Sequence, residues 1–310
     1  MSTVKKIGIS LVLLIILAIA VVYFLFQNAM KPVDPSASSD VFLVEQGSSI
    51  TSTLQKLEEE SLIRSAFFTR LYLRFTDYDG LQAGHYELSA SMDTKSMLEK
   101  IFSGSTINPN EITVTFPEGK TLDEFAEILS NSTDYSRDDI VSVWTDDAFI
   151  LEAIENYWFI SDEIQNPNLK YALNGYFFPN TYKFEDPQVS PETVGKRLLD
   201  QMDQVLSKYK DSIESSKYSP HEILTLASII EYEAIEDEDR PMISGVFHNR
   251  LNTSMRLQSC ATLQMALGVH KEIYTNQDMQ VDSPYNTYRV DGLPIGPGNS
   301  PGEKSIAAAL

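Results

Sequence analysis

The stretch Leu226–Arg240 contains the side chains of this sequence that are best suited to acid–base chemistry. It reads LASIIEYEAIEDEDR, an apolar helical pattern followed by six acidic residues among the nine positions 231–239. A carboxyl group at the edge of an apolar surface is partly desolvated, which favours its neutral form and allows it to act as a general acid near neutral pH. Most acidic runs are only a solvated helix face, so the question is whether Glu231 or Glu233 differs from its neighbours.

Helical geometry separates these two carboxylates. At 100° per residue, the predicted helix HEILTLASIIEYEA buries a stripe of five residues: Ile223, Leu226, Ala227, Ile230 and Ala234. Glu231 lies at the margin of this stripe and is predicted to be partly desolvated, whereas Glu233 belongs to the solvated acidic face. In an alternative interpretation, Glu231 is an ordinary boundary glutamate paired with an arginine such as Arg250 or Arg256.

Polar and aromatic residues on either side of this helix are further candidates for ligand binding. Asn249 in HNRL and Asn286 in YNTY either hydrogen-bond a substrate or stabilise turns. The aromatic residues of YNTY and GYFFPNTY either stack on sugar rings or pack in the core and loops. Cys260 is expected to be a small buried hydrophobic residue.

The composition excludes several classes of protein. The chain of 310 residues has 24 Lys and Arg against 44 Asp and Glu, a net charge of −20 that repels polyanions, so no nucleic-acid partner is expected. One cysteine permits no intramolecular disulfide, and the four histidines form no HExxH or Cys/His motif, so no metal site is predicted. The sequence also lacks the G-x-S-x-G elbow and the phosphate-binding loop.

The N-terminus predicts a membrane anchor. Residues 7–26 are twenty residues without a charge, enough for a helix to span the roughly 30 Å hydrocarbon core of a bilayer. A cleaved signal peptide is the alternative, but the one Ala-x-Ala sequence, Ala18–Ala20, lies inside the apolar run. We therefore expect an uncleaved anchor that holds residues 1–6, with Lys5 and Lys6, in the cytoplasm and the rest of the chain outside it.

The next segments predict a tether and a small α+β module. Residues 27–40 form a Pro- and Ser-rich spacer without periodicity. A strand, two helices and a returning strand follow in the order βααβ, and then a helix over TKSMLEKIF. FLVEQGSSITSTLQKL, from Phe42, aligns without gaps with VTFPEGKTLDEFAEIL, from Val114, which suggests a repeated strand–Gly–cap–helix unit; Thr121 and Glu124 would form a capping box in the second copy.

The remainder of the chain is predicted to be mostly helical. Residues 122–199 are broken by the turn-rich LNGYFFPNTYKFEDP, and a long Pro- and Gly-dense run, SPYNTYRVDGLPIGPGNSPG, has the length of a loop that lines a binding site. After Pro301 the sequence predicts the first turns of a helix, and the C-terminus is expected to be truncated.

Taken together, these motifs resemble the endolytic murein transglycosylase family (MltG, or YceG-like). The matching stretches come in family order after the anchor: LQAGHYELS, FPEGKTLDEFA, GYFFPNTYKF, LASIIEYE, VFHNRL, MRLQSCATLQMALG and SPYNTYRVDGLPIGPGNSPG. The resemblance covers the chain from about Val41. The sequence departs from the family pattern at Tyr232 and Ala234, at Asn174 and Asn180, and at Ile295, Gly298 and Ser300 of the last loop.

The resemblance implies a bacterial inner-membrane enzyme with a LysM-like module and an extracytoplasmic catalytic domain. Such an enzyme cleaves the MurNAc–GlcNAc β-1,4 bond of peptidoglycan internally and leaves 1,6-anhydro-MurNAc ends, without a cofactor. By position Glu231 is the family's catalytic glutamate, the same residue that helical geometry selects. The substrate-binding residues expected beside it are Glu233, Asn249, Arg250, Gln258, Tyr285, Asn286 and Tyr288.

The predicted architecture is therefore α+β, with a transmembrane helix at 7–26, a linker at 27–40, a LysM-like βααβ module at 41–108 and a catalytic domain at 109–310. Peptidoglycan strands are the expected substrate, and cell-wall synthases such as penicillin-binding proteins are possible partners. The alternatives are a non-catalytic wall-binding scaffold and a hydrolytic muramidase, which would use a positioned water and a second carboxylate.

Overall fold

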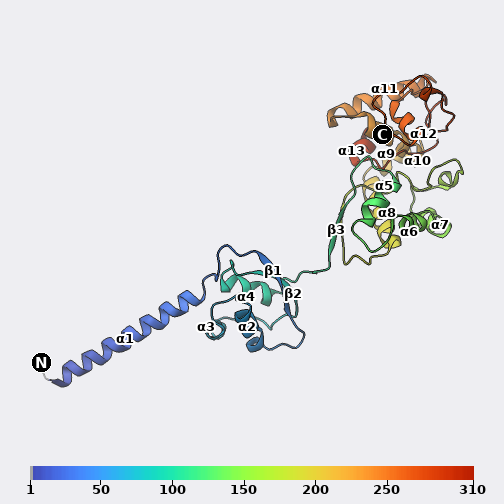
Figure 1. Cartoon of the computed structure of the whole chain (residues 1–310). Coiled ribbons are helices and arrows are strands. Elements are labelled where there is room, and N and C mark those ends of the chain that lie inside the picture. Colours follow the sequence, from blue (N-terminus) through green and yellow to red (C-terminus); the bar gives the residue numbers. More distant parts are fainter. Residues whose placement is uncertain (1–2) are drawn as a thin grey trace. The chain divides into compact units, whose positions relative to one another are not determined.

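A computed structural model describes residues 3–310 of the chain, with side chains from residue 7 onward. It is a mixed α and β structure, mostly helical, with two small two-stranded sheets in the described residues. The chain divides into two compact units, residues 1–109 and 110–310, and each unit has its own hydrophobic core. Figure 1 colours both units along the sequence.

The first unit begins with a single long apolar helix, α1 (Thr3–Ala29). Its segment Ile7–Ala29 is long and apolar enough to cross a membrane, and its side chains from residue 7 to residue 25 are all exposed. The apolar helix predicted at residues 7–26 is therefore present and runs one further turn, as expected of either a membrane anchor or a signal sequence.

The rest of the first unit has the predicted order of elements. These are β1 (Ser39–Val44), α2 (Ile50–Glu59), α3 (Ala66–Leu73), β2 (Gly84–Ser89) and α4 (Thr94–Ser103). The strands pair antiparallel, with Phe42 opposite Tyr86, and both of these side chains are buried. Leu57 of α2 and Met97 of α4 complete the centre of this core, because each helix buries one apolar face against the two strands.

The segment between α1 and β1 is bonded to this module. The backbone N–H of Thr94 donates to the carbonyl of Met30 at 3.1 Å, and those of Val33 and Asp34 donate to the carbonyl of Ala90 at 3.0 Å. The Arg64 guanidinium donates to the carbonyl of Pro32. Residues 27–40, expected to be a spacer without regular structure, thus contain the end of one helix, the start of a strand and several long-range hydrogen bonds.

The second unit contains two short strands and a series of helices. In chain order these are β3 (Ile112–Thr115), α5 (Leu122–Ser130), α6 (Arg137–Trp144), α7 (Asp147–Asn156), the 3-10 turn η1 (Asp162–Gln165), β4 (Thr181–Phe184), α8 (Pro191–Ser207), α9 (Lys210–Ser215), α10 (Pro220–Glu233), η2 (Asp237–Asp239), α11 (Arg240–Asn252), α12 (Cys260–Leu267), η3 (Asp278–Gln280) and α13 (Glu303–Ala309). Strand β4 lies in a stretch that the sequence predicted to be turns only; it pairs antiparallel with β3, Tyr182 opposite Val114. The helix predicted after Pro301 is α13.

The predicted repeat is present in the local backbone. Gly47 and Gly119, which align in the two copies, both have left-handed backbone angles, with φ of 83° and 74°. This conformation favours glycine. Ser49 and Thr121 then cap α2 and α5, each within a capping box. The two copies share a strand–glycine–cap–helix geometry, although each strand pairs with a different partner in its own sheet.

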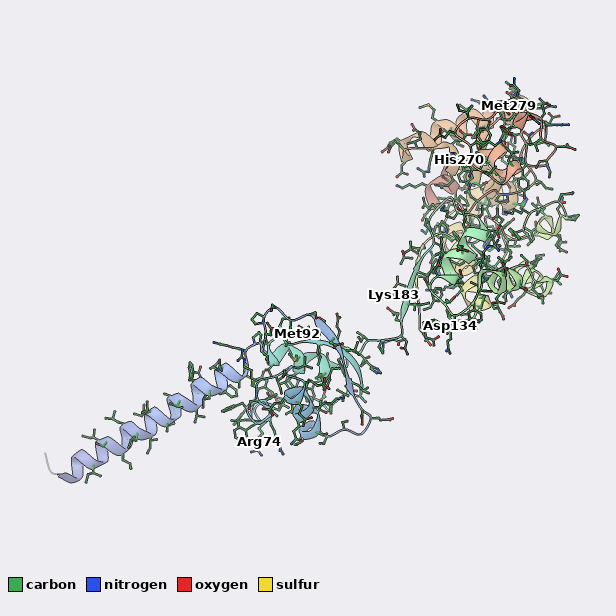
Figure 2. The ribbon with its side chains drawn as sticks, viewed as in Figure 1. Arg74, Met92, Asp134, Lys183, His270 and Met279 are labelled. Atoms are coloured by element: carbon green, nitrogen blue, oxygen red, sulfur yellow. The ribbon has the colours of Figure 1, made fainter. Side chains whose placement is uncertain are left out.

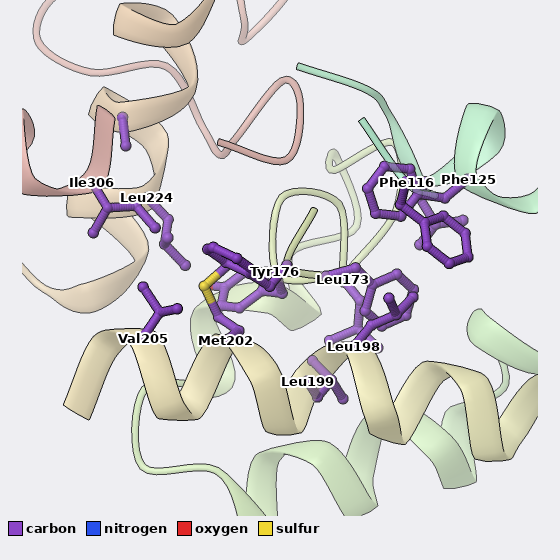
Figure 3. Packing of buried hydrophobic residues seen from close by; sticks show 14 of the residues in the cluster. Phe116, Phe125, Leu173, Tyr176, Leu198, Leu199, Met202, Val205, Leu224 and Ile306 are labelled. Atoms are coloured by element: carbon purple, nitrogen blue, oxygen red, sulfur yellow. The ribbon is translucent and has the colours of Figure 1, made fainter. Parts of the chain in front are cut away.

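Helix α10 runs through the centre of the second unit. Every residue from Ile223 to Ile230 is buried, so the predicted five-residue stripe was too narrow, and its last member, Ala234, is the partly exposed C-cap. A helix that is apolar on all sides belongs in a core. Figure 3 shows Leu224 of α10 and Ile306 of α13 near the side chains of α8, among them Val205.

Candidate active site

Glu231 lies near the C-terminal end of this buried helix. Only 8% of its side-chain surface is exposed. One carboxylate oxygen accepts a hydrogen bond from the Arg240 guanidinium at 3.2 Å, and the other accepts from the backbone N–H of Gly302 at 3.0 Å. The prediction that Glu231 is partly desolvated is therefore confirmed, and its orientation is set by donors from Arg240 and Gly302.

Arg240, the first residue of α11, contacts Glu231 of α10 and also residues of α13 and η2. Its side chain is 9% exposed, and besides the ion pair with Glu231 it donates to the Ser305 hydroxyl of α13 at 2.9 Å and to Asp237 of η2. The arginine partner that the sequence suggested was Arg250 or Arg256. The structure instead shows Arg240, nine residues further along, because the turn after α10 reverses the chain and brings the start of α11 back to Glu231.

A second carboxylate, Glu118, lies on the other side of Gly302. A Cβ atom at position 302 would collide with the Glu118 carboxyl group, so a larger residue there would displace this flexible side chain; the φ of −75° at Gly302 suits any residue. Desolvation, followed by the negative charge of Glu231, raises the pKa of Glu118. Two carboxylates of different burial thus flank one glycine. The sequence analysis quoted Glu118 within FPEGKTLDEFA but gave it no role.

The Pro- and Gly-rich loop that carries Gly302 is held on several sides. The Asn299 side chain donates to the carbonyl of Ser228 at 2.8 Å, and Asn174 donates to the carbonyl of Pro297 at 2.8 Å. The backbone N–H of Gly119 donates to the carbonyl of Ser300 at 2.9 Å. These bonds connect the loop to α10 and to the β3–α5 turn, so the loop positions the backbone N–H that contacts Glu231.

Glu233 has a different environment from the predicted one. It is half-buried, and one carboxylate oxygen accepts from the Ser259 hydroxyl at 2.5 Å and from the backbone N–H of Ala261 at 3.3 Å. Ala261 is in the first turn of α12, whose N-cap residue makes no side-chain capping bond of its own. Glu233 therefore satisfies a free N–H at the start of α12 and is not part of a solvated acidic face.

Several predicted substrate-binding residues gather around Glu233. Arg250 and Gln258 line a hollow of about 270 Å³ together with Glu233. The Tyr288 hydroxyl lies 3.5 Å from the sulfur of Cys260 at the start of α12, and desolvation and then this contact raise the pKa of Tyr288 to about 12. Cys260 is exposed, which corrects the expectation of a buried cysteine.

The other three predicted residues do not line this hollow. Asn249 is exposed on α11. Asn286 is fully buried and uses its side-chain amide to donate to the carbonyls of Met279 and Val281, so it stabilises the loop, one of the two roles that the sequence left open. Tyr285 is 8% exposed and lines a second hollow.

This second hollow, of about 420 Å³, lies beside the residue that follows Glu231. Tyr232, Tyr285 and His270 contribute to its lining, together with Asp123 and Lys170, which form an ion pair at 2.9 Å. Aromatic rings with a few polar groups are a common composition for a carbohydrate or other polar ligand site. The sequence did not indicate this hollow, because its residues come from six separate stretches.

The geometry at Glu231 suits proton transfer by a single carboxyl group. The group is nearly removed from solvent, and its two oxygens are held in place by donors from Arg240 and Gly302. Glu118 provides a second carboxylate on the solvent side of Gly302.

The chain belongs to the YceG-like family, whose model matches residues 42–310. It is 35% identical to the endolytic murein transglycosylase of Bacillus subtilis strain 168 over 92% of this chain and 79% of that protein. It is 31% identical to the protein of the same name from Streptococcus pneumoniae serotype 2, over the whole of this chain and 59% of the relative's length.

A solved structure has the same fold. The crystal structure of a yceG-like protein from Listeria monocytogenes superposes with a TM-score of 0.61 at 36% identity, covering 88% of this chain and 89% of that one. The predicted family is therefore confirmed.

Proposed function

We propose that this protein is a membrane-anchored endolytic lytic transglycosylase that cleaves the MurNAc–GlcNAc β-1,4 bond within peptidoglycan strands. The observation that carries the proposal is the shielded Glu231 carboxylate, held by Arg240 and Gly302 in a member of a family whose named relatives are murein transglycosylases. The product would carry a 1,6-anhydro-MurNAc end.

The proposed reaction needs one proton-transferring group and no water. Protonated Glu231 gives its proton to the glycosidic oxygen while the bond from that oxygen to C1 of MurNAc breaks. The 6-hydroxyl of the same MurNAc attacks C1, and its proton returns to the Glu231 carboxylate. Acid and base are then the same residue, which fits the presence of a single shielded carboxylate at the site.

Helix α1 would anchor the enzyme in the bacterial cytoplasmic membrane, with the βααβ module and the second unit on the extracytoplasmic side. The support is the charge-free run after Lys5 and Lys6, since positive residues stay on the cytoplasmic side. This location would place the enzyme where new glycan strands are made, beside cell-wall synthases as partners.

The test is digestion of purified sacculi by the full-length protein, with mass spectrometry of the released ends. Glu231→Gln keeps the size of the side chain and removes its titratable proton, and we expect the rate of anhydro-muropeptide release to fall by at least about 10²-fold while the variant stays folded and binds glycan. Glu233→Gln retains an acceptor for Ser259 and should lose far less.

The outcomes separate the alternatives. Reducing MurNAc ends in place of anhydro ends would indicate a hydrolytic muramidase. No cleavage by a folded, glycan-binding wild-type protein would indicate a wall-binding scaffold. An active Glu231→Gln beside an inactive Glu233→Gln would show that the catalytic carboxylate is Glu233.

A further inference from the structure

Helix α3 and its flanks differ in charge from the rest of the chain. Residues 61–76 contain three arginines, Arg64, Arg70 and Arg74, and no acidic residue, in a protein whose net charge is −20. The same stretch exposes two large aromatic side chains, Phe67 at 72% and Phe75 at 82%. A basic and aromatic surface on a strongly acidic protein requires a specific explanation.

These residues share one side of the module. At 100° per residue, Phe67, Arg70 and Arg74 point to the same side of α3, while Thr69 on the opposite side is fully buried. Phe75 follows directly. We call these four residues the Phe67 face. Within residues 3–310, the guanidinium groups of Arg70 and Arg74 form no hydrogen bond or ion pair, and both side chains are exposed, so these groups are available to a ligand. Arg74 is labelled in Figure 2.

One ring contact shows which end of the apolar helix α1 lies beside α3. Phe68 of α3 packs edge-to-face on Phe26 of α1, with ring centroids 6.3 Å apart. Phe26 is the last residue of the twenty-residue apolar run 7–26, which at about 1.5 Å per residue is about 30 Å long, the thickness of the hydrocarbon core. If α1 spans a bilayer, α3 must therefore lie at the boundary between hydrocarbon and headgroups.

We propose that the Phe67 face rests on the bilayer and binds the headgroups of anionic phospholipids. Phenylalanine on an interfacial helix buries its ring at the boundary between headgroups and acyl chains, the depth at which α3 lies, and arginine donates paired hydrogen bonds to phosphate. The proposal rests on the proposed membrane anchoring of α1. It adds a second membrane contact that fixes the orientation of the first unit, because α1 alone leaves that unit free to tilt.

Site-directed spin labelling of the full chain in lipid vesicles tests this inference. In a Cys260→Ser background, single labels are placed at Phe67→Cys, at Glu59→Cys as an exposed control on α2, and at Leu17→Cys within α1. In phosphatidylglycerol vesicles we expect the ratio of oxygen to nickel-chelate accessibility to be several-fold higher at position 67 than at position 59. The ratio at position 17 should be the highest.

The label at position 17 separates the two hypotheses. If the ratio at position 67 equals that at position 59 while position 17 lies in hydrocarbon, the Phe67 face does not rest on the bilayer. The proposed anchor is unaffected by this result. A water-exposed label at position 17 overturns the anchor, and the depth argument with it.

Headgroup recognition is tested in the same system. Arg70→Gln with Arg74→Gln should lower the ratio at position 67 several-fold in phosphatidylglycerol vesicles, whereas Lys95→Gln, an exposed cation on α4, should not change it. Pure phosphatidylcholine vesicles should give the same low ratio as the double variant. Equal ratios in the two lipids, unaffected by the arginine substitutions, would overturn the assignment to anionic headgroups.

Discussion

At the scale of single residues, the site depends on how Glu231 is surrounded. The sequence predicted its shielded position correctly, since a helical wheel uses only local spacing. It did not predict Arg240 as partner or Glu118 as neighbour, because both contacts depend on the path of the chain between α10 and α13. Local periodicity carries no information about such tertiary contacts.

Glu118 offers a test of the site's electrostatics. Its pKa is raised from 4.5 in the folded protein, so folding favours the protonated form, and the ionised carboxylate costs stability at pH values above the unfolded-state pKa. Glu118→Gln should therefore stabilise the protein at pH 7, by less than about 1 kcal/mol because the group is solvent-screened. Below pH 4.5 the gain should disappear. Denaturant unfolding at the two pH values measures this.

Glu127→Gln is the matched control, because Glu127 is an exposed residue on α5. It should leave the unfolding free energy unchanged at both pH values. If Glu118→Gln lowers stability at pH 7, the carboxylate must have a stabilising partner and the electrostatic account is wrong. The stabilised variant should also cleave peptidoglycan more slowly, since functional sites commonly sacrifice stability for activity.

At the scale of elements, the connection between α10 and α12 depends on Glu233. The carboxylate at the end of one helix accepts from Ser259 and from an N–H in the first turn of the other. Glu233→Ala removes the acceptor, and we expect a loss of about 1 kcal/mol in unfolding free energy, the usual contribution of a helix cap. Urea unfolding monitored by circular dichroism measures the loss.

Glu238→Ala is a control for this substitution, because Glu238 is exposed in η2. It should change stability little. In a double-mutant cycle with Ser259→Ala, the effects should be less than additive, since both changes remove the same hydrogen bond. Additive effects would show that the two side chains do not interact.

Elements differed in how well the sequence predicted them. Helices with an N-cap and an apolar stripe, such as α2 and α5, were predicted correctly because their signals are local. Strand β4 was missed, since its four residues form a strand only by pairing with β3, more than sixty positions earlier in the chain. The long loop was recognised as ordered, but the bonds that hold it come from Ser228, Asn174 and Gly119, which no local pattern connects.

At the scale of the whole molecule, the two units have separate cores. Every contact described for Glu231, to Arg240, Gly302 and the neighbouring Glu118, comes from within residues 110–310. The bonds of Thr94 and Ala90 join the end of α1 to the first unit only. The described contacts of Glu231 therefore come from the second unit, and the described bonds of the segment after α1 are made with the βααβ module.

Deletion of residues 41–103 tests this separation. The second unit keeps its own core, so the variant should fold and cleave soluble glycan strands at a rate comparable to that of the full chain. On intact sacculi it should release fewer products, because the βααβ module would no longer hold the enzyme at the wall. Anhydro ends are measured from both substrates, with Glu231→Gln in the same background as the inactive control. Loss of activity on sacculi alone indicates that the deleted module positions the enzyme on the wall, whereas loss on both substrates indicates damage to the active site. A folded deletion variant without activity on either substrate would show that the module contributes residues to the active site.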